Sequence, residues 1–245
     1  FALGMWDDVA RMNERSWRAS IERAERQELG PGAYSYHALW WLHYAHLQRG
    51  RMDEAGRFLD VAREALAESG AGTIRYHLQQ MRAAHIVADP AGAVDAGLAD
   101  AALADTTGGD YARAANLLAA GLALARAGRV TRAERATALL RDVAGDGSDD
   151  VLRVSETLLR GALLVEAGEQ EEGLALLRDA ATAEASIPYQ FGPPLIVKPA
   201  SELLGEALLA ADDREGARAA FERALERAPG RALSVRGLAA AGGGP

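Results

Sequence analysis

Histidine and aromatic side chains are concentrated near the start of the chain. All five histidines fall between positions 37 and 85, at His37, His43, His46, His77 and His85. A neutral imidazole can bind a transition metal, or donate and accept hydrogen bonds. Trp40 and Tyr44 lie in the same stretch and offer rigid contact area to a partner. The stretch from His37 to His85 is therefore the first candidate for chemistry.

Two interpretations of this cluster need no metal. In one, the side chains pack between helices and satisfy one another locally. In the other, they form a recognition surface, in which Trp40 and Tyr44 supply contact area. Hydrogen bonds would then come from His37, His77 and Gln80. The residue types alone leave both interpretations open.

A third interpretation is a metal site. His43 and His46 are i, i+3 neighbours on a predicted helix over 33–48, and transition metals accept imidazole pairs. However, that helix carries no carboxylate, and no recognised ligand motif is present. We therefore predict neither a metal nor a cofactor.

A pair of carboxylates near the other end of the chain also has helical spacing. Glu202 and Glu206 are four positions apart and share one face of a predicted helix over 199–211. Such a pair usually forms a solvated acidic face, and the alternative is a contact with a basic or amine-bearing ligand. The carboxylates of a glycosidase flank a sugar from opposite sides, which one helix face does not provide.

Motifs of the common enzyme classes are absent. The chain contains no Gly-x-Ser-x-Gly elbow, no phosphate-cradling loop, no His-Glu-x-x-His and no dinucleotide fingerprint. We therefore predict a protein that is not an enzyme.

The elements that must position these residues recur with a period of about forty residues. In the clearest copy, small, aromatic and turn residues stand at regular offsets, namely Leu204, Gly205, Ala217, Phe221, Ala224 and Pro229. On these residues the chain resembles the tetratricopeptide repeat family, as a divergent, bacterial-type member with long repeats. The resemblance implies an all-α fold, an α-solenoid of stacked antiparallel helical hairpins with a concave groove.

The repeats predict a single domain over residues 1–245. Its predicted parts are a half-repeat at 1–30, repeats at about 33–70, 73–105, 110–145, 150–185 and 199–229, and a capping helix at 231–241. Turns are expected at Gly128, at Gly168 and, in the last copy, at Asp212. Small residues such as Gly205 are expected where two helices cross closely. The half-repeat at the start leads us to expect natural residues before Phe1.

The resemblance also implies which residues face the groove. By repeat position these are His37, Trp40, Tyr44, Gln48, His77, Gln80, Glu202 and Glu206. The first four share one helical stripe. We therefore expect a non-catalytic scaffold whose groove holds a peptide or protein partner. The alternative is a metal- or small-molecule-binding protein, an enzyme included, that uses the cluster from His37 to His85.

The helices predicted between turns, for example over 91–104, are interrupted by two segments, a flexible loop at 105–110 and a longer apolar segment at 186–199. Residues 186–199 contain four prolines, which exclude helix and favour an extended path. We expect this apolar segment to pack across the helices. In the alternative it is a flap over one end of the groove, formed by Tyr189, Phe191 and Lys198.

The amino-acid composition limits the kinds of partner and compartment that we expect. The net charge of −8 disfavours nucleic acid, whose phosphates need a basic surface. No apolar run approaches the roughly 20 residues that span a bilayer. The absence of cysteine fits the cytosol, which we favour slightly, or a periplasm if a signal peptide precedes Phe1. The sequence leaves the oligomeric state open.

Overall fold

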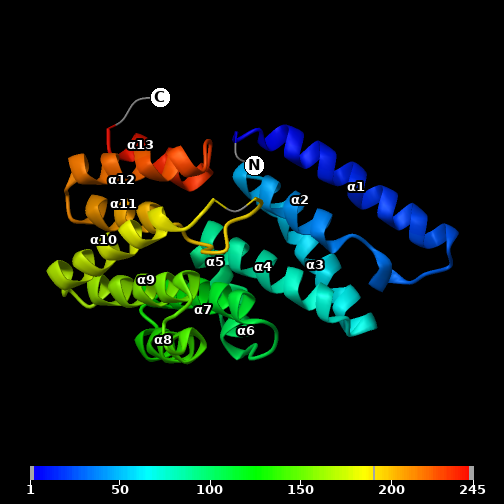
Figure 1. The fold of residues 1–245 in the computed structure, drawn as a ribbon, viewed down its shortest axis with the longest axis horizontal. Helices are drawn as coiled ribbons and strands as arrows, with labels where there is room; N and C mark the ends of the chain where they lie inside the picture. The colour runs from blue at the N-terminus through cyan, green and yellow to red at the C-terminus, as the bar shows by residue number, and fades with distance from the viewer. Residues whose placement is uncertain (1–2, 190, 243–245) are drawn as a thin grey trace.

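A computed structural model describes residues 3–189 and 191–242, and no β-strand occurs among them. The all-α prediction is confirmed. Along the described residues the helices shown in Figure 1 are α1 (Trp6–Arg26), the short 3-10 helix η1 (Pro31–Ala33), α2 (Tyr36–Gln48), α3 (Met52–Ser69), α4 (Gly72–Ala88), α5 (Pro90–Asp95), α6 (Leu98–Ala104), α7 (Asp110–Arg126), α8 (Val130–Ala144), α9 (Asp150–Glu166), α10 (Gln170–Ser186), α11 (Ala200–Ala210), α12 (Arg214–Arg227) and α13 (Ala232–Ala240). None of these helices combines the length and apolarity needed to cross a membrane.

Several turns between helices contain a residue in the left-handed backbone conformation. Gly128, between α7 and α8, has φ 69°, and Gly168, between α9 and α10, has φ 89°. Asp212 takes the same conformation between α11 and α12, with φ 60°. Glycine lacks the Cβ that strains this region, and aspartate tolerates it better than most residues. The turns predicted at these three positions are confirmed.

Two predicted helices differ from the observed ones. The helix expected over 91–104 is wrong, because the chain forms α5 and α6 with a break at Gly97, whose φ is 72°. The helix expected over 33–48 begins later, at Tyr36, after the turn η1. The side chain of Ser35 caps this start by accepting a hydrogen bond from the Ala38 backbone N–H.

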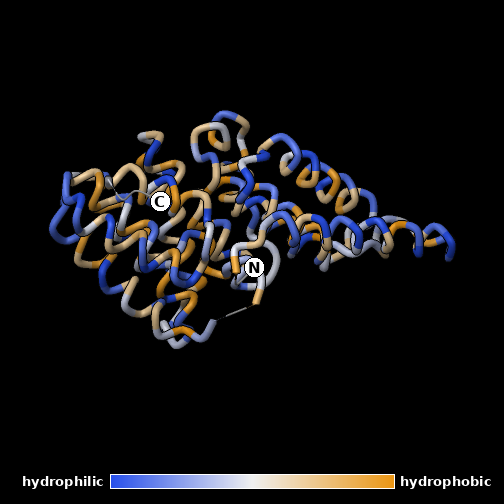
Figure 2. Tube along the Cα trace, turned by 90° about the horizontal axis from the view of Figure 1, so that it is seen from above, coloured by the Kyte–Doolittle hydropathy of each residue, from blue (hydrophilic) through white to orange (hydrophobic). Residues whose placement is uncertain are grey.

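Helices that are not consecutive form one continuous layer. α2 contacts α4, α4 contacts α7, α7 contacts α9, and α9 contacts α11, and we call these five helices the central layer. The helices between them pack on two consecutive members, as α3 does on α2 and α4, and as α10 does on α9 and α11. Helices α2 and α7 of the central layer are therefore buried on most sides, whereas α3 and α8 bury one face, and Figure 2 shows apolar and polar residues alternating along the chain.

Small residues let the paired helices approach closely. A Cβ added to Gly205 of α11 would lie 2.9 Å from the ring of Phe221 on α12, closer than normal contact. At Gly161 of α9, the added atom would lie 3.1 Å from the carbonyl oxygen of Gly173 on α10. The prediction that small side chains occupy the helix crossings is confirmed for Gly205.

The buried core changes in character along the chain. Around α1 to α4 it contains large aromatic residues, among them Trp17, Tyr36 and Trp40. From α4 to α12 it consists mainly of alanine and leucine, with Phe221 as a large exception. The small side chains allow the later helices to pack closely, whereas the aromatic rings fill a wider space between the earlier ones.

The first two helices contact the turn before α13 and its first residue. The Trp6 indole donates a hydrogen bond to the Gly230 carbonyl oxygen at 2.9 Å. The Arg231 guanidinium donates to the Tyr44 hydroxyl, and the Ala232 backbone N–H donates to Gln48 Oε1 at 2.9 Å. We call these three contacts the terminal bridge, because they join α1 and α2 to the turn before α13 (Figure 1).

Candidate functional site

The proline-rich segment, residues 187–199, lies between the two ends of the chain. The Arg227 guanidinium holds its start by donating to the carbonyl oxygens of Glu184, at 2.9 Å, and Ile187, at 3.1 Å. Ile196 and Val197 are buried, so the expected packing across the helices is confirmed for them. By contrast, Tyr189 and Phe191 are exposed. The segment is therefore held at its start by Arg227, has exposed side chains at Tyr189 and Phe191, and is buried in its second half.

Lys198, near the end of the segment, belongs to a set of linked charges that we call the buried ion network. Lys198 Nζ donates to Glu202 Oε1 at 3.0 Å, and it also bonds to Glu206. Arg231 Nε donates to Glu202 Oε2 at 2.7 Å. Arg126 of α7 forms an ion pair with Glu206. The network thus connects α7, α11, the proline-rich segment and the turn before α13.

Burial of this network is nearly complete at its centre. Glu202 is 0% exposed, Lys198 2% and Arg231 2%. Burial by itself would raise the pKa of Glu202, but Arg231 and Lys198 outweigh it and hold that pKa well below its ordinary value. The solvated acidic face predicted for Glu202 is therefore wrong. Glu202 and Lys198 bond to residues of the chain itself, and Glu206 is only partly exposed.

Around the exposed Phe191 of the segment, six rings form what we call the aromatic–imidazole cluster. Its members are His37, Trp40 and Trp41 of α2, Tyr76 and His77 of α4, and Phe191 of the segment. The ring centroids of His37 and Trp41 are 4.9 Å apart, and those of Trp41 and Phe191 are 5.4 Å apart. His77 connects to the same group through His37, at 6.0 Å.

The cluster has a buried base and an exposed top. Trp40 is buried beneath it, and so is Gln80, whereas His37 is exposed and Phe191 is 77% exposed. The Nδ1 atom of His77 lies 2.7 Å from the Thr73 carbonyl oxygen, so Nδ1 carries the proton and Nε2 accepts when the ring is neutral. Burial lowers the pKa of His77. The lowered pKa favours the neutral form of the His77 ring.

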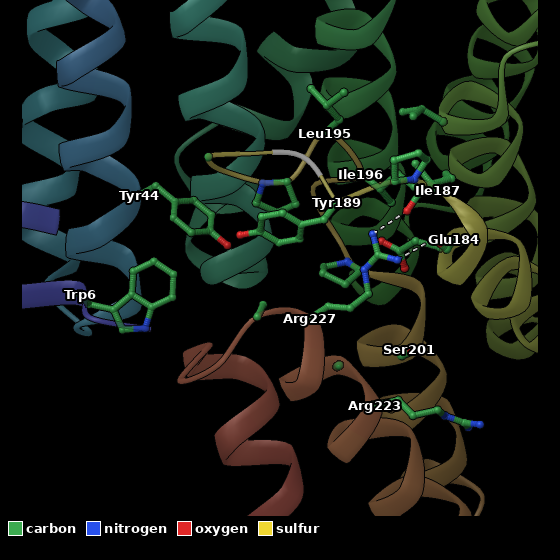
Figure 3. A pocket seen from close by; sticks show the side chains of 17 residues that line it. Trp6, Tyr44, Glu184, Ile187, Tyr189, Leu195, Ile196, Ser201, Arg223 and Arg227 are labelled. Carbon is green, nitrogen blue, oxygen red and sulfur yellow. Dashed lines mark hydrogen bonds between the residues drawn. The ribbon is translucent and has the colours of Figure 1, made fainter. Parts of the chain in front are cut away.

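A pocket opens beside this cluster, and we call it the tyrosine pocket (Figure 3). Its volume is about 100 Å³. Tyr44 and Tyr189 point their hydroxyl groups toward one another across it, and Trp6 lies beside Tyr44 (Figure 3). Ile187 and Leu195 of the proline-rich segment supply apolar wall. The pocket therefore has room for one apolar or aromatic side chain beside the two tyrosine hydroxyl groups.

The charged groups around the tyrosine pocket serve structural contacts. Arg227 donates to backbone carbonyls, as Figure 3 shows, and Glu184 Oε2 accepts from the Ala200 backbone N–H at 2.6 Å. Burial raises the pKa of Glu184. Arg223 also lines the pocket, but in Figure 3 its guanidinium points away from the centre. These charged side chains are therefore not placed to contact a group bound in the tyrosine pocket.

The cluster and the tyrosine pocket share one stretch of backbone. Gly192 lines the pocket, and its φ is 114°, which side chains rarely adopt. A Cβ at Gly192 would also lie 2.9 Å from the Trp41 ring. Both observations require glycine here, because the segment must turn sharply while touching Trp41. The exposed rings and the pocket are thus two parts of one surface.

The remaining histidines lie in the interior. His43 is 0% exposed, and neither of its ring nitrogens has a hydrogen-bond partner among residues 3–189 and 191–242. Its ring centroid is 5.7 Å from that of His85. Burial, His85 and His46 together lower the pKa of His43 well below its ordinary value. In the described part of the chain, no three His, Cys, Asp or Glu side chains are grouped to hold a metal.

The predicted groove residues therefore fall into separate places. His37, Trp40 and His77 come together in the aromatic–imidazole cluster, with Gln80 buried nearby. Tyr44 lines the tyrosine pocket, and Gln48 belongs to the terminal bridge. Glu202 and Glu206 lie in the buried ion network. Sequence reasoning did not select four residues that shape these sites: Trp41, Arg126, Arg227 and Arg231.

Comparisons with protein-family models, with curated proteins and with solved structures found no match to this chain. The arguments for function therefore come from the geometry of these sites.

Proposed function

We propose that this chain is a non-catalytic, tetratricopeptide-like binding scaffold, an α-solenoid that holds a peptide segment of a protein partner. The continuous central layer supports the solenoid arrangement, because α2, α4, α7, α9 and α11 contact one another in order. The close crossing at Gly205 and the turns at Gly128, Gly168 and Asp212 support the repeat.

One observation carries the binding role. A large aromatic ring, Phe191, is 77% exposed on a segment that the rest of the chain anchors firmly. It lies against Trp41, and the same segment turns at Gly192 into the tyrosine pocket. Exposed aromatic residues on a rigid support, next to a pocket, are typical of protein interaction sites.

The partner we propose is an extended peptide with two apolar side chains. One would enter the tyrosine pocket between Tyr44 and Tyr189, and the other would cover Phe191 and Trp41. The central layer beneath is occupied by Val197, Lys198 and their buried contacts, so the peptide lies over the proline-rich segment.

Selection from a random peptide library displayed on phage would test this proposal on the whole chain. We expect enriched peptides with two apolar or aromatic positions. Their affinity should fall at least about ten-fold in the double variant Tyr189→Ala, Phe191→Ala, since hot-spot residues supply most of the binding energy. Val130→Ala is the matched control, because Val130 is 61% exposed and lies away from this surface.

Two outcomes would overturn the proposal. One is a selection that enriches no peptide, and the other is enriched peptides that bind the double variant as tightly as the wild type.

A further inference from the structure

A second and larger cavity adjoins the terminal bridge. It is bounded by the C-terminal ends of α2 and α4, by Val197 and by the start of α13, and we call it the bridge cleft. Its volume is about 430 Å³. That value lies in the range of small-molecule sites, about 300–1,000 Å³. The tyrosine pocket, with room for one side chain, is much smaller.

The walls of the bridge cleft are mainly apolar. Leu47 of α2, Val87 of α4, Val197 of the proline-rich segment and Leu233 of α13 all line it. No aspartate or glutamate lines it within residues 3–189 and 191–242. A hydrocarbon chain placed here would leave water for an apolar environment, which is favourable by about 25 cal/mol per Å² of buried surface.

The charged side chains of the bridge cleft are both arginines. Arg236 is exposed and forms no ion pair within the part of the chain that the structure describes. Arg231 is buried and donates four hydrogen bonds. Its Nε and Nη2 atoms both donate to the Glu202 carboxylate. Nη2 also donates to the Val197 carbonyl oxygen, and Nη1 donates to the Tyr44 hydroxyl. A guanidinium has five N–H groups, so these four bonds leave one N–H of Nη1 available to donate.

The charge balance behind Arg231 is also positive. Lys198 and Arg231 share Glu202, while Glu206 is shared between Lys198 and Arg126. Three positive and two negative side chains leave one positive charge in the buried ion network. The guanidinium groups of Arg126 and Arg231 stay protonated, so their positive charges are permanent.

We propose that the bridge cleft binds an apolar molecule that carries one carboxylate, such as a medium-chain fatty acid. Its hydrocarbon chain lies between the ends of α2 and α4, and its carboxylate lies beside Arg231 and Arg236. A carboxylate complements arginine in shape and charge, and the apolar walls complement the chain. This activity is separate from peptide binding, since Tyr44 is the one residue that lines both cavities in the part of the chain that the structure describes.

Isothermal titration of the whole chain with octanoate tests the charge requirement. Octanol has the same chain with no charge, and octylamine has the opposite charge. We expect octanoate to bind at least about ten-fold more tightly than octanol, with octylamine the weakest, because hydrogen bonds to charged groups are the stronger ones. Equal binding of octanoate and octylamine, or no binding of octanoate at millimolar concentration, would overturn the proposal.

Substitutions locate the site. Arg236→Gln should weaken octanoate binding about ten-fold, whereas Arg129→Gln, at another exposed arginine, should leave it unchanged. Ala88→Phe should block the cleft, because Ala88 lines it. If Ala88→Phe does not fold, the methyl NMR signals of Val87 and Leu233 in the wild type provide the same information. They should shift on addition of octanoate, and unchanged signals would contradict the assignment.

Tyr189→Ala separates this inference from the proposed peptide site. The side chain of Tyr189 lines the tyrosine pocket and not the bridge cleft. Octanoate binding should therefore be the same in Tyr189→Ala as in the wild type. A large loss of octanoate affinity in that variant would place the ligand in the tyrosine pocket instead.

Discussion

The buried ion network and the aromatic–imidazole cluster are both built on the central layer, but they differ in how far their side chains are exposed. In the network, Glu202 is 0% exposed and pairs with Lys198 and Arg231. In the cluster, His37 and Phe191 are exposed and no carboxylate approaches them within ion-pair distance in the described residues. The proline-rich segment causes this difference. Its second half covers α11, whereas Phe191 in its first half lies against Trp41.

This difference teaches that a repeat position does not by itself define a binding residue. Whether a side chain on the central layer meets a partner depends on what the rest of the chain places over it. Lys198 occupies the space over Glu202 and Glu206, whereas the ring of Phe191, which lies against Trp41, is itself exposed. The following variants test how far the two regions differ.

The largest effect is expected at the centre of the buried ion network. Glu202→Ala leaves Lys198 and Arg231 buried without their shared carboxylate, and we expect the free energy of unfolding to fall by about 3–5 kcal/mol. Urea unfolding measures this change, provided that the slope of the free energy of unfolding against urea concentration is the same in the variant and the wild type.

Glu222→Ala is the matched control for Glu202→Ala. Glu222 is exposed on α12 and pairs with Arg218 at 3.5 Å. Exposed ion pairs contribute about 1 kcal/mol or less, so this variant should unfold almost as the wild type does. Equal losses in the two glutamate variants would show that Glu202 is not buried as described.

The next effect concerns pH and the interior histidines. Unfolded His43 takes up a proton near pH 6.5, but the folded protein does so only at lower pH, because the pKa is lowered by burial, His85 and His46. The unfolded state therefore binds more protons below about pH 6.5, and stability falls as the pH falls. Each such group contributes up to about 1.4 kcal/mol per pH unit.

His43→Leu isolates this contribution. The free energy of unfolding of the variant should decrease less steeply with acid than that of the wild type. His46, His77 and His85 also have lowered pKa values, so part of the dependence remains. At pH 8, where the imidazoles are neutral, the variant should be at least as stable, since it removes two buried nitrogens without partners. An unchanged slope would mean that water reaches His43.

A smaller effect is expected at the terminal bridge, which fastens the two regions together. Gln48→Ala removes the hydrogen bond to the Ala232 backbone N–H and should cost about 0.5–1.5 kcal/mol. Because the loss is local, amide hydrogen exchange should quicken in α13 and stay unchanged in α9. Equal acceleration in both helices would show that Gln48 supports the whole fold.

The helices and their turns could be predicted from the sequence because they follow from local rules. Helical periodicity and the residues Gly128, Gly168 and Asp212 identified the turns, and all three adopt the left-handed conformation. The break in the predicted helix over 91–104 was missed, since a single glycine such as Gly97 is often tolerated inside a helix.

The sites depend on contacts between distant residues, which leave no periodic trace. Trp6 and Gly230 meet although 224 positions separate them, and Arg231 reaches Tyr44 across 187 positions. One signal was present: Lys198, Glu202 and Glu206 follow one another at intervals of four residues. That spacing places a cation and two carboxylates on one line, but it does not reveal that the line is buried.

The smallest effect on stability is expected at Phe191, and it separates the two regions most cleanly. Phe191→Ala removes a ring that is 77% exposed, so the free energy of unfolding should change by less than about 0.5 kcal/mol. Phe221 is 0% exposed between α11 and α12, and Phe221→Ala should cost about 3–5 kcal/mol. Thermal and urea unfolding of the two variants provide the comparison. If Phe191→Ala proved as destabilising as Phe221→Ala, Phe191 would be part of the core, and its exposure could not support a binding surface.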